Sequence, residues 1–374
     1  MTIANSAIAR GVVVTYPNRK NEPEHEKIVH QQLARRLAVL TGREFAGEYD
    51  PAVHDREHCY FVPSGSIVGA ERSRDLGITG EQDLFGGVVP YSFVATKAIT
   101  HPLIREHSRA PKGWSQAFCE QVRDAVLPGY TAFSLEDARE AGLHLLQQGP
   151  LRLKPVLATA GRGQVRIDDP VVLDQMLAQV NGGEMNECGL VLEANLEDVT
   201  TISVGQVRLG GRIISYHGTQ RLTVDNRGEQ VYGGSDLVVV DGDFDTLQAL
   251  DMPDDIHLAI EQAAVYDQAA SACFPDFYAS RRNYDIARGI GPGGHACSGV
   301  LEQSWRIGGA SSAEIAALDV FTHNDAPAVV RASSLELYGY GRQLPTNATV
   351  LFSGEDAEVG YISKSVVVED YGRT

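Results

Sequence analysis

The chain has 374 residues, enough for two or three domains, and its 43% hydrophobic and 22% charged residues are typical of a globular protein. A formal net charge of −17 repels phosphate backbones and anionic lipids, which argues against a nucleic-acid or membrane partner. We find no apolar run of bilayer length and no secretory signal, and the five scattered cysteines fit free thiols in a reducing cytoplasm. The oligomeric state is left open.

The first 90 residues predict a small α/β unit. A β-branched run at 11–16 predicts a buried strand, and apolar residues at helical spacing predict a helix over 22–41 that stops at Gly42. A second strand is expected at 60–62 and a second helix at 67–76. Alternation of strands and helices favours a layered α/β arrangement.

The rest of the chain predicts helices together with a mostly antiparallel layer. Ser134 begins a capping pattern for a helix to 148, and Asp169-Pro170 begins a helix that fades at 182–183. The segment 232–236, with two adjacent glycines, is interpreted as a loop. Further helices are expected at 253–272 and 311–317, and strands at 151–155, 190–193, 202–207, 212–216, 281–287, 299–306 and 349–352.

The last two long strands place acidic residues together. If Gly293 and Gly294 form a two-residue hairpin turn, the pairing register puts Asp285 directly opposite Glu302. Because side chains alternate between faces of a strand, the same face also carries a set of polar and charged residues. That set is Arg281, Asn283, Ser304 and Arg306.

Paired carboxylates predict a cation. Two carboxylates this close repel unless a cation lies between them, and Mg²⁺ prefers oxygen ligands that it shares with substrate phosphates. Nearby arginines can bind the remaining phosphate or carboxylate charge. The alternative is a solvated strand face with cross-strand salt bridges.

A second segment has features of a phosphate site. Lys154 ends a predicted strand, and the small-residue loop 160–164 follows it. Backbone N–H groups of such loops can approach phosphate oxygens closely. The pattern is neither GxxxxGK[ST] nor GxGxxG, and an ordinary turn also fits it.

In this order, the lysines, the glycine loop, the acid-ended strand 190–193 and the two distant acids resemble the ATP-grasp superfamily, which includes biotin carboxylase and D-alanine–D-alanine ligase. The resemblance covers roughly residues 90–320, and the first 90 residues resemble the domain that precedes that fold. Segments such as LFGGVVP, VATKAITHPL and LEQSWRIGGAS are similar to an uncharacterised bacterial family of unknown function. The resemblance implies an α/β (α+β) ATP-grasp fold with parts 1–92, 93–188 and 189–374.

The resemblance also implies a role for each matching residue. Lys97 and Lys154 match the lysines that contact ATP phosphates, and Asp285 and Glu302 match the acidic metal ligands. Arg306 matches the arginine of the E-x-N-x-R segment. The implied nucleotide-binding residues are Gly161, Arg162 and Gly163 in the mobile loop, Glu193, Asn195 and Leu196 at the adenine, and Glu197 or Asp198 at the ribose.

One departure concerns the metal site. The usual E-x-N is E-Q-S here, so Ser304 stands where an asparagine normally binds the second metal. We hypothesise that Asn283, on the same face, supplies the missing amide oxygen. Arg221 is a candidate for the phosphates or for an ordinary surface position, and strand alternation lets only one of Arg281 and Arg282 face the site, with Arg281 favoured.

The implied activity is that of an ATP-dependent carboxylate–amine ligase. Mg-ATP would phosphorylate a small-molecule carboxylate to an acyl phosphate, and an amine or another nucleophile would displace phosphate, with ADP as the second product. The alternatives are a nucleotide-binding protein that acts as a sensor or regulator without catalysis, and a kinase on the same fold.

Overall fold

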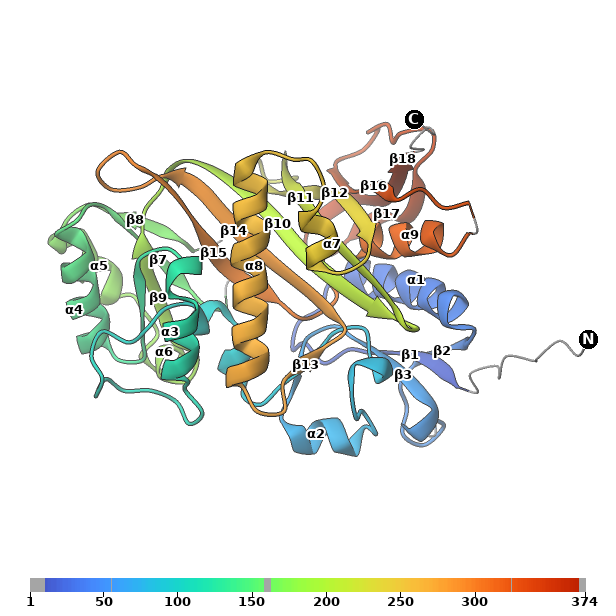
Figure 1. The fold of residues 1–374 in the computed structure, drawn as a ribbon, viewed down its shortest axis with the longest axis horizontal. Coiled ribbons are helices and arrows are strands. Elements are labelled where there is room, and N and C mark those ends of the chain that lie inside the picture. The colour runs from blue at the N-terminus through green and yellow to red at the C-terminus, as the bar shows by residue number, and fades with distance from the viewer. Residues whose placement is uncertain (1–10, 55, 158–162, 324, 370–374) are drawn as a thin grey trace, which may run out of the picture.

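The computed structural model describes residues 11–54, 56–157, 163–323 and 325–369. The N-terminal unit is a parallel three-stranded sheet of order β2-β1-β3, with α1 packed on it (Figure 1). Helix α1 ends at Gly42, whose φ of 67° is the left-handed conformation expected of a glycine cap. The bounds are β1 Val12–Tyr16, α1 Glu24–Thr41, β2 Glu44–Glu48 and β3 Cys59–Pro63.

The predicted helix over 67–76 is wrong in its first part. Ile67–Val68 forms a short strand, β4, and only Ala70–Asp75 forms a helix, α2. Gly69 has a φ of 91°, which interrupts any continuous helix. Strand β4 joins β5 (Gly87–Val89) and β13 (Tyr278–Ala279) in a small sheet that ties the N-terminal unit to the later chain.

A four-stranded antiparallel sheet of order β6-β9-β7-β8 forms the second layer. The Ser134 hydroxyl accepts a hydrogen bond of 3.1 Å from the Asp137 N–H, and this cap starts α4 as predicted. At Gly182, where the sequence predicts that a helix fades, Asn181 instead caps a new helix. The bounds are β6 Gly129–Ala132, α4 Leu135–Leu146, β7 Leu151–Pro155, β8 Val165–Ile167, α5 Pro170–Leu177, α6 Gly182–Cys188 and β9 Leu190–Ala194.

An eight-stranded antiparallel sheet of order β15-β14-β10-β11-β12-β16-β18-β17 forms the centre of the molecule, and α8 lies across it in Figure 1. The antiparallel prediction is confirmed. The strands are β10 Glu197–Leu209, β11 Arg212–Val224, β12 Gln230–Asp241, β14 Arg281–Ile290, β15 Ala296–Ser304, β16 Val329–Tyr338, β17 Thr349–Asp356 and β18 Gly360–Glu369. The helices that remain are α3 Gln116–Gln121, α7 Phe244–Gln248, α8 Asp254–Cys273 and α9 Ser311–Phe321.

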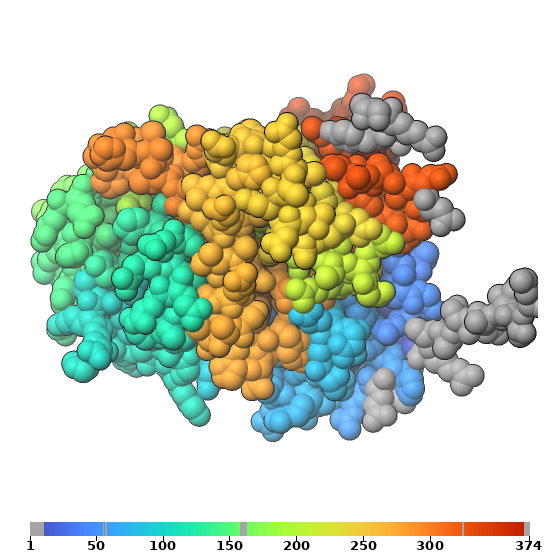
Figure 2. All heavy atoms as spheres, in the orientation of Figure 1, coloured from blue at the N-terminus to red at the C-terminus, as the bar shows by residue number. Residues whose placement is uncertain are grey.

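The N-terminal unit and the large sheet share one hydrophobic core. Leu33 and Leu37 of α1 belong to the same buried cluster as Ile214 of β11 and Leu318 of α9. In Figure 2 the blue N-terminal region accordingly abuts the yellow-green region that contains β11 and the red-orange region that contains α9. Among the helices in the described part of the chain, none has the length and apolar character needed to cross a bilayer.

Candidate active site

The two acids of the metal hypothesis face one another. Asp285 on β14 pairs in register with Glu302 on β15, as the sequence predicts. The expected common face is also observed, because Asn283 Nδ2 lies 3.0 Å from Asp285 Oδ1 and Arg281 Nη1 lies 3.3 Å from the Ser304 hydroxyl.

The pairing of the hairpin near its loop differs from the prediction. Ile290 pairs with Ala296, so the loop is wider than the predicted two-residue turn, although Gly293 and Gly294 both have positive φ values. This displaces the pairing by one residue. A bulge that leaves Leu301 as an extra residue on β15 then restores it before the acids are reached. The predicted turn is wrong, and the predicted pair of acids is correct.

The surroundings of Asp285 favour a bound cation. Its Oδ1 accepts hydrogen bonds of 3.0 Å from both the Ser203 hydroxyl and the Asn283 amide. Burial, followed by the charge of Glu302, raises the pKa of Asp285, and these hydrogen bonds only partly oppose the rise. A divalent cation between the two carboxylates would favour both charged forms, so this donor set fits Mg²⁺.

Lys97 completes the charge pattern beside the acids. Its Nζ lies 2.7 Å from Oε2 of Glu302, and the lysine side chain is 7% exposed while that of Glu302 is 39% exposed. Lys97 begins a single 3₁₀ turn that contacts β15, which holds the ammonium group against the strand. The Lys97 ammonium group therefore lies beside the cross-strand pair of carboxylates, in the part of the β14–β15 hairpin that is farther from its loop.

The second predicted lysine belongs to a separate buried cluster. Lys154 of β7 forms an ion pair with Glu193 of β9, and His101 Nε2 lies 3.1 Å from the other carboxylate oxygen. All three side chains are at most 4% exposed. Burial alone would raise the pKa of Glu193, but the charge of Lys154, together with His101, lowers it to about 2. The sequence did not single out His101.

From this cluster we expect the free energy of unfolding to fall in acid. The folded-state pKa of Glu193 lies below its ordinary value of 4.5, so its stabilising effect is present above pH 4.5 and is lost as the pH falls towards 2. The difference between these two pKa values corresponds to roughly 3 kcal/mol of the free energy of unfolding. Urea unfolding at pH 6, 4 and 3 should show that the free energy of unfolding falls more steeply with decreasing pH for the wild type than for Glu193→Gln. The exposed Glu184→Gln is the control, and equal pH dependence in all three proteins would contradict the assignment.

The predicted adenine residues lie where β9 leads into β10. The Asn195 side-chain oxygen accepts a 2.8 Å hydrogen bond from Arg152, and Leu196 is buried. Asp198 has a φ of 51°, which bends the first residues of β10. Gly161 and Arg162 lie outside the described residues, whereas Gly163 has a φ of 69° next to Pro155.

Arg281 does not present its charge to a ligand. Its guanidinium is buried in an ion pair with Glu314, where Nη2 lies 2.6 Å from Oε1. It also donates to the Ser304 carbonyl and hydroxyl oxygens at 3.1 and 3.3 Å. We therefore assign Arg281 a structural role. The Ser304 oxygen, held against this cation, is a poor metal ligand.

The other two arginines differ from one another. Arg221 is half-exposed and forms an ion pair with Asp236 on the neighbouring strand, which favours the surface alternative. Arg306 is partly buried, and the hydrogen bond it donates goes to the Ile307 carbonyl at 2.9 Å. Burial, then the charges of Arg19 and Arg281, lower the pKa of Arg306. The charges of Glu26 and Glu302 oppose this lowering without offsetting it, and within the described ranges no carboxylate is in ion-pair contact with Arg306, so its environment favours an anionic ligand.

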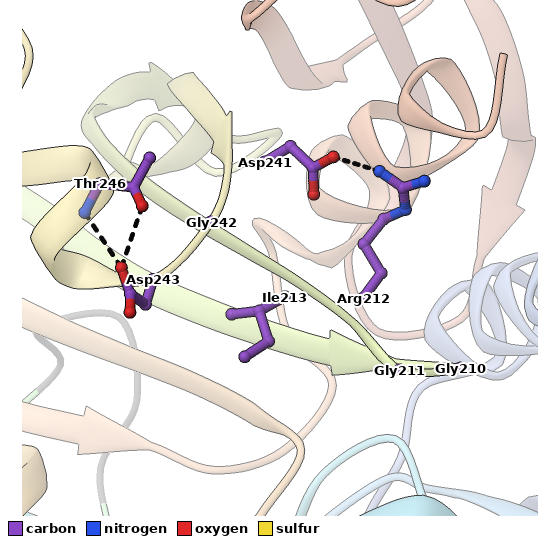
Figure 3. Close-up of a pocket in the computed structure, with 8 residues that line it drawn as sticks. All are labelled: Gly210, Gly211, Arg212, Ile213, Asp241, Gly242, Asp243 and Thr246. Carbon is purple, nitrogen blue, oxygen red and sulfur yellow. Dashed lines mark hydrogen bonds and ion pairs between the residues drawn. The ribbon is translucent and has the colours of Figure 1, made fainter. Parts of the chain in front are cut away.

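A shallow depression at the far end of the large sheet is a poor candidate for the site. It lies between the β10–β11 turn and α7 (Figure 3). Arg212 and Asp241 neutralise each other there, and Asp243 is engaged in capping α7 through Thr246. Asp285 pairs with Ser203 near the other end of the paired part of β10 and β11, so the depression is several residues away from Asp285.

The overall fold is similar to that of solved ATP-grasp structures. The structure matches a phosphoribosylamine–glycine ligase from Thermotoga maritima with a TM-score of 0.54 and 14% identity, covering 95% of this chain and 92% of that one. It matches a biotin carboxylase from Campylobacter jejuni, described as a β,γ-ATP complex, with a TM-score of 0.52 and 11% identity, covering 96% and 87%. At these identities the likeness shows the fold alone.

The family is defined by sequence. Residues 13–366 match the family described as protein of unknown function DUF3182, and the chain belongs to that family. Among curated proteins no sequence matches the chain.

Proposed function

We propose that this chain uses Mg-ATP to activate a small-molecule carboxylate and transfers the acyl group to an amine or another nucleophile. The observation that supports this most directly is the cross-strand pair of Asp285 and Glu302, with Lys97 Nζ 2.7 Å from Glu302, on an ATP-grasp fold. The products would be ADP, phosphate and the ligated acyl compound.

In this proposal the acids hold Mg²⁺, which neutralises phosphate charge when it is bound. Lys97 would exchange Glu302 for a phosphate oxygen once the metal satisfies that carboxylate. Lys154 would similarly leave Glu193 or share its protons between the carboxylate and a phosphate. The chain contributes mainly positioning and charge neutralisation, as phosphoryl transfer requires.

The adenine would lie along the end of β9, against Glu193, Asn195 and Leu196, with Asp198 as a candidate for the ribose. The loop with Gly161, Arg162 and Gly163 would close over the phosphates. The nucleotide would thus lie between parts 93–188 and 189–374.

The chemistry balances in two steps. A carboxylate oxygen of the substrate forms a bond to the γ-phosphorus while the bond to the β,γ-bridging oxygen breaks and ADP leaves. The nucleophile then attacks the carbonyl carbon, loses a proton to solvent, and phosphate leaves with the former carboxylate oxygen. Arg306 lacks an ion-pair partner in the described part of the chain and would bind the anionic substrate or the transferred phosphoryl group.

The test combines binding and isotope transfer. We expect a non-hydrolysable ATP analogue to bind in calorimetry more tightly with Mg²⁺ than without it. ADP release should then be screened against a pool of ¹⁸O-labelled carboxylates with and without amines, and ¹⁸O should appear in the released phosphate. Binding without turnover would favour a nucleotide-binding regulator, and a stable phosphorylated product without an amine would favour a kinase. Failure to bind nucleotide would overturn the proposal.

A further inference from the structure

The missing amide of the E-Q-S segment has a counterpart on the neighbouring strand. Ser304 pairs directly with Asn283 across the β14–β15 ladder. The Ser304 hydroxyl accepts a hydrogen bond from Arg281, whereas the Asn283 side chain lies beside Asp285. An amide and a hydroxyl thus occupy opposite positions of one cross-strand pair.

A tyrosine two strands away reaches this amide because a glycine lies between them. Gly205 on β10 pairs with Tyr216 on one side and with Asn283 on the other. A Cβ atom at Gly205 would lie 2.3 Å from the Tyr216 hydroxyl oxygen, so any side chain there would displace the ring. With glycine, the tyrosine crosses β10 and its hydroxyl oxygen lies 2.9 Å from the Asn283 side-chain oxygen.

The tyrosine has one proton for two acceptors. Its hydroxyl oxygen also lies 2.6 Å from Oε1 of Glu314, a buried carboxylate paired with Arg281. A phenolic hydroxyl keeps its proton at neutral pH, so Tyr216 can donate one hydrogen bond. Hydrogen bonds to a charged acceptor are the stronger ones, so the Tyr216 hydroxyl donates its hydrogen bond to the Glu314 carboxylate. The hydroxyl oxygen can then only accept from Asn283.

Rotating the Asn283 carboxamide by half a turn lets it donate to the Tyr216 oxygen. The two ends of a carboxamide are nearly equal in size, so Nδ2 can donate to Tyr216 while Oδ1 faces Asp285. The atom at that end of the amide lies 3.0 Å from Asp285 Oδ1. Two oxygens at this distance repel, unless both bind a cation. Neighbouring oxygens around Mg²⁺, each about 2.1 Å from the ion, are about 3.0 Å apart.

We propose that the Glu314–Tyr216 pair orients the Asn283 carboxamide so that its oxygen binds metal beside Asp285, replacing from the opposite strand the ligand that Ser304 lacks. This inference rests on the proposed function, because it requires a metal at Asp285 and Glu302. Tyr216 and Glu314 are positioning residues in this arrangement, and Gly205 makes room for it.

The experiment counts bound manganese. Mn²⁺ is titrated into the full chain with a non-hydrolysable ATP analogue and followed by electron paramagnetic resonance. Asn283→Ser should weaken binding of the second ion by at least about tenfold. The swap of Asn283→Ser with Ser304→Asn exchanges the two residues of one pair, conserves total side-chain volume and should restore most of the affinity. Tyr216→Phe should weaken the same ion while Asn283 is unchanged.

The outcomes separate this inference from the proposed function. Unchanged manganese binding in Asn283→Ser, or in Tyr216→Phe, would overturn the inference while leaving the Asp285–Glu302 site intact. A wild-type protein that binds a single ion would do the same. A wild type that binds no manganese with the analogue would overturn both. Should Asn283→Ser fail to fold, Tyr216→Phe and Asn283→Asp are tested in its place. Asn283→Asp keeps an oxygen at that position and should bind the second manganese ion at least as tightly as the wild type, and weaker binding would overturn the inference.

Discussion

Asp285→Asn should reduce Mg-dependent ATP turnover by about 10²–10³-fold, the size of effect seen when one preorganised charge-stabilising group is removed from a site. It should do so without lowering the stability of the metal-free protein. The pKa of Asp285 is raised by burial and by Glu302, so its negative charge disfavours the folded state at neutral pH. Asparagine retains an oxygen that can accept from the Ser203 hydroxyl.

Two measurements check this prediction. Steady-state ADP release gives the loss of turnover, and thermal unfolding with and without Mg²⁺ and the nucleotide analogue gives the change in stability. The wild type should gain thermal stability from the ligands, whereas Asp285→Asn should gain little. Asp276→Asn, an exposed position in the turn before β13, is the matched control. A variant with wild-type turnover would show that Asp285 is no metal ligand.

The facing acids could be predicted from sequence only because two local errors cancel. The two glycines correctly indicate a hairpin, but the loop is one residue out of the predicted register. The compensating bulge at Leu301 has no local sequence signal, because it depends on how β15 packs against the rest of the molecule. A strand assignment alone therefore fixes which residues alternate, whereas the partner of each residue depends on tertiary structure.

Other features could not be predicted from the sequence for a similar reason. The segment 232–236 is part of β12, although its adjacent glycines favour a loop. A Cβ at Gly234 would lie 2.0 Å from the Ser334 carbonyl oxygen, so this glycine permits a close approach of strands. His101 and Tyr216 reach Glu193 and Asn283 from distant segments, and no spacing in the sequence indicates such contacts. The lysines and acids could be proposed from the sequence because their residue types are suited to phosphate and metal binding.

The buried ion pair behind the site should be the most sensitive point for stability. Arg281 and Glu314 are 2% and 0% exposed, and Arg281→Met would leave the Glu314 carboxylate buried without its cation. We expect a loss of about 3–5 kcal/mol in the free energy of unfolding. Urea unfolding of the metal-free protein measures it, and a cost below about 1 kcal/mol would contradict the assignment of this pair as fully desolvated.

Replacing both partners should separate stability from metal binding. Arg281→Met combined with Glu314→Leu removes both charges, and an apolar pair of similar volume often recovers most of the stability lost in the single variant. With Glu314 absent, Tyr216 can donate its proton to the Asn283 oxygen, which favours the orientation that turns Nδ2 towards Asp285. The double variant should therefore unfold at a urea concentration near that of the wild type and still bind the second manganese ion weakly. Recovery of both properties together would mean that the ion pair acts on the fold alone, and that Glu314 has no part in orienting the metal ligand.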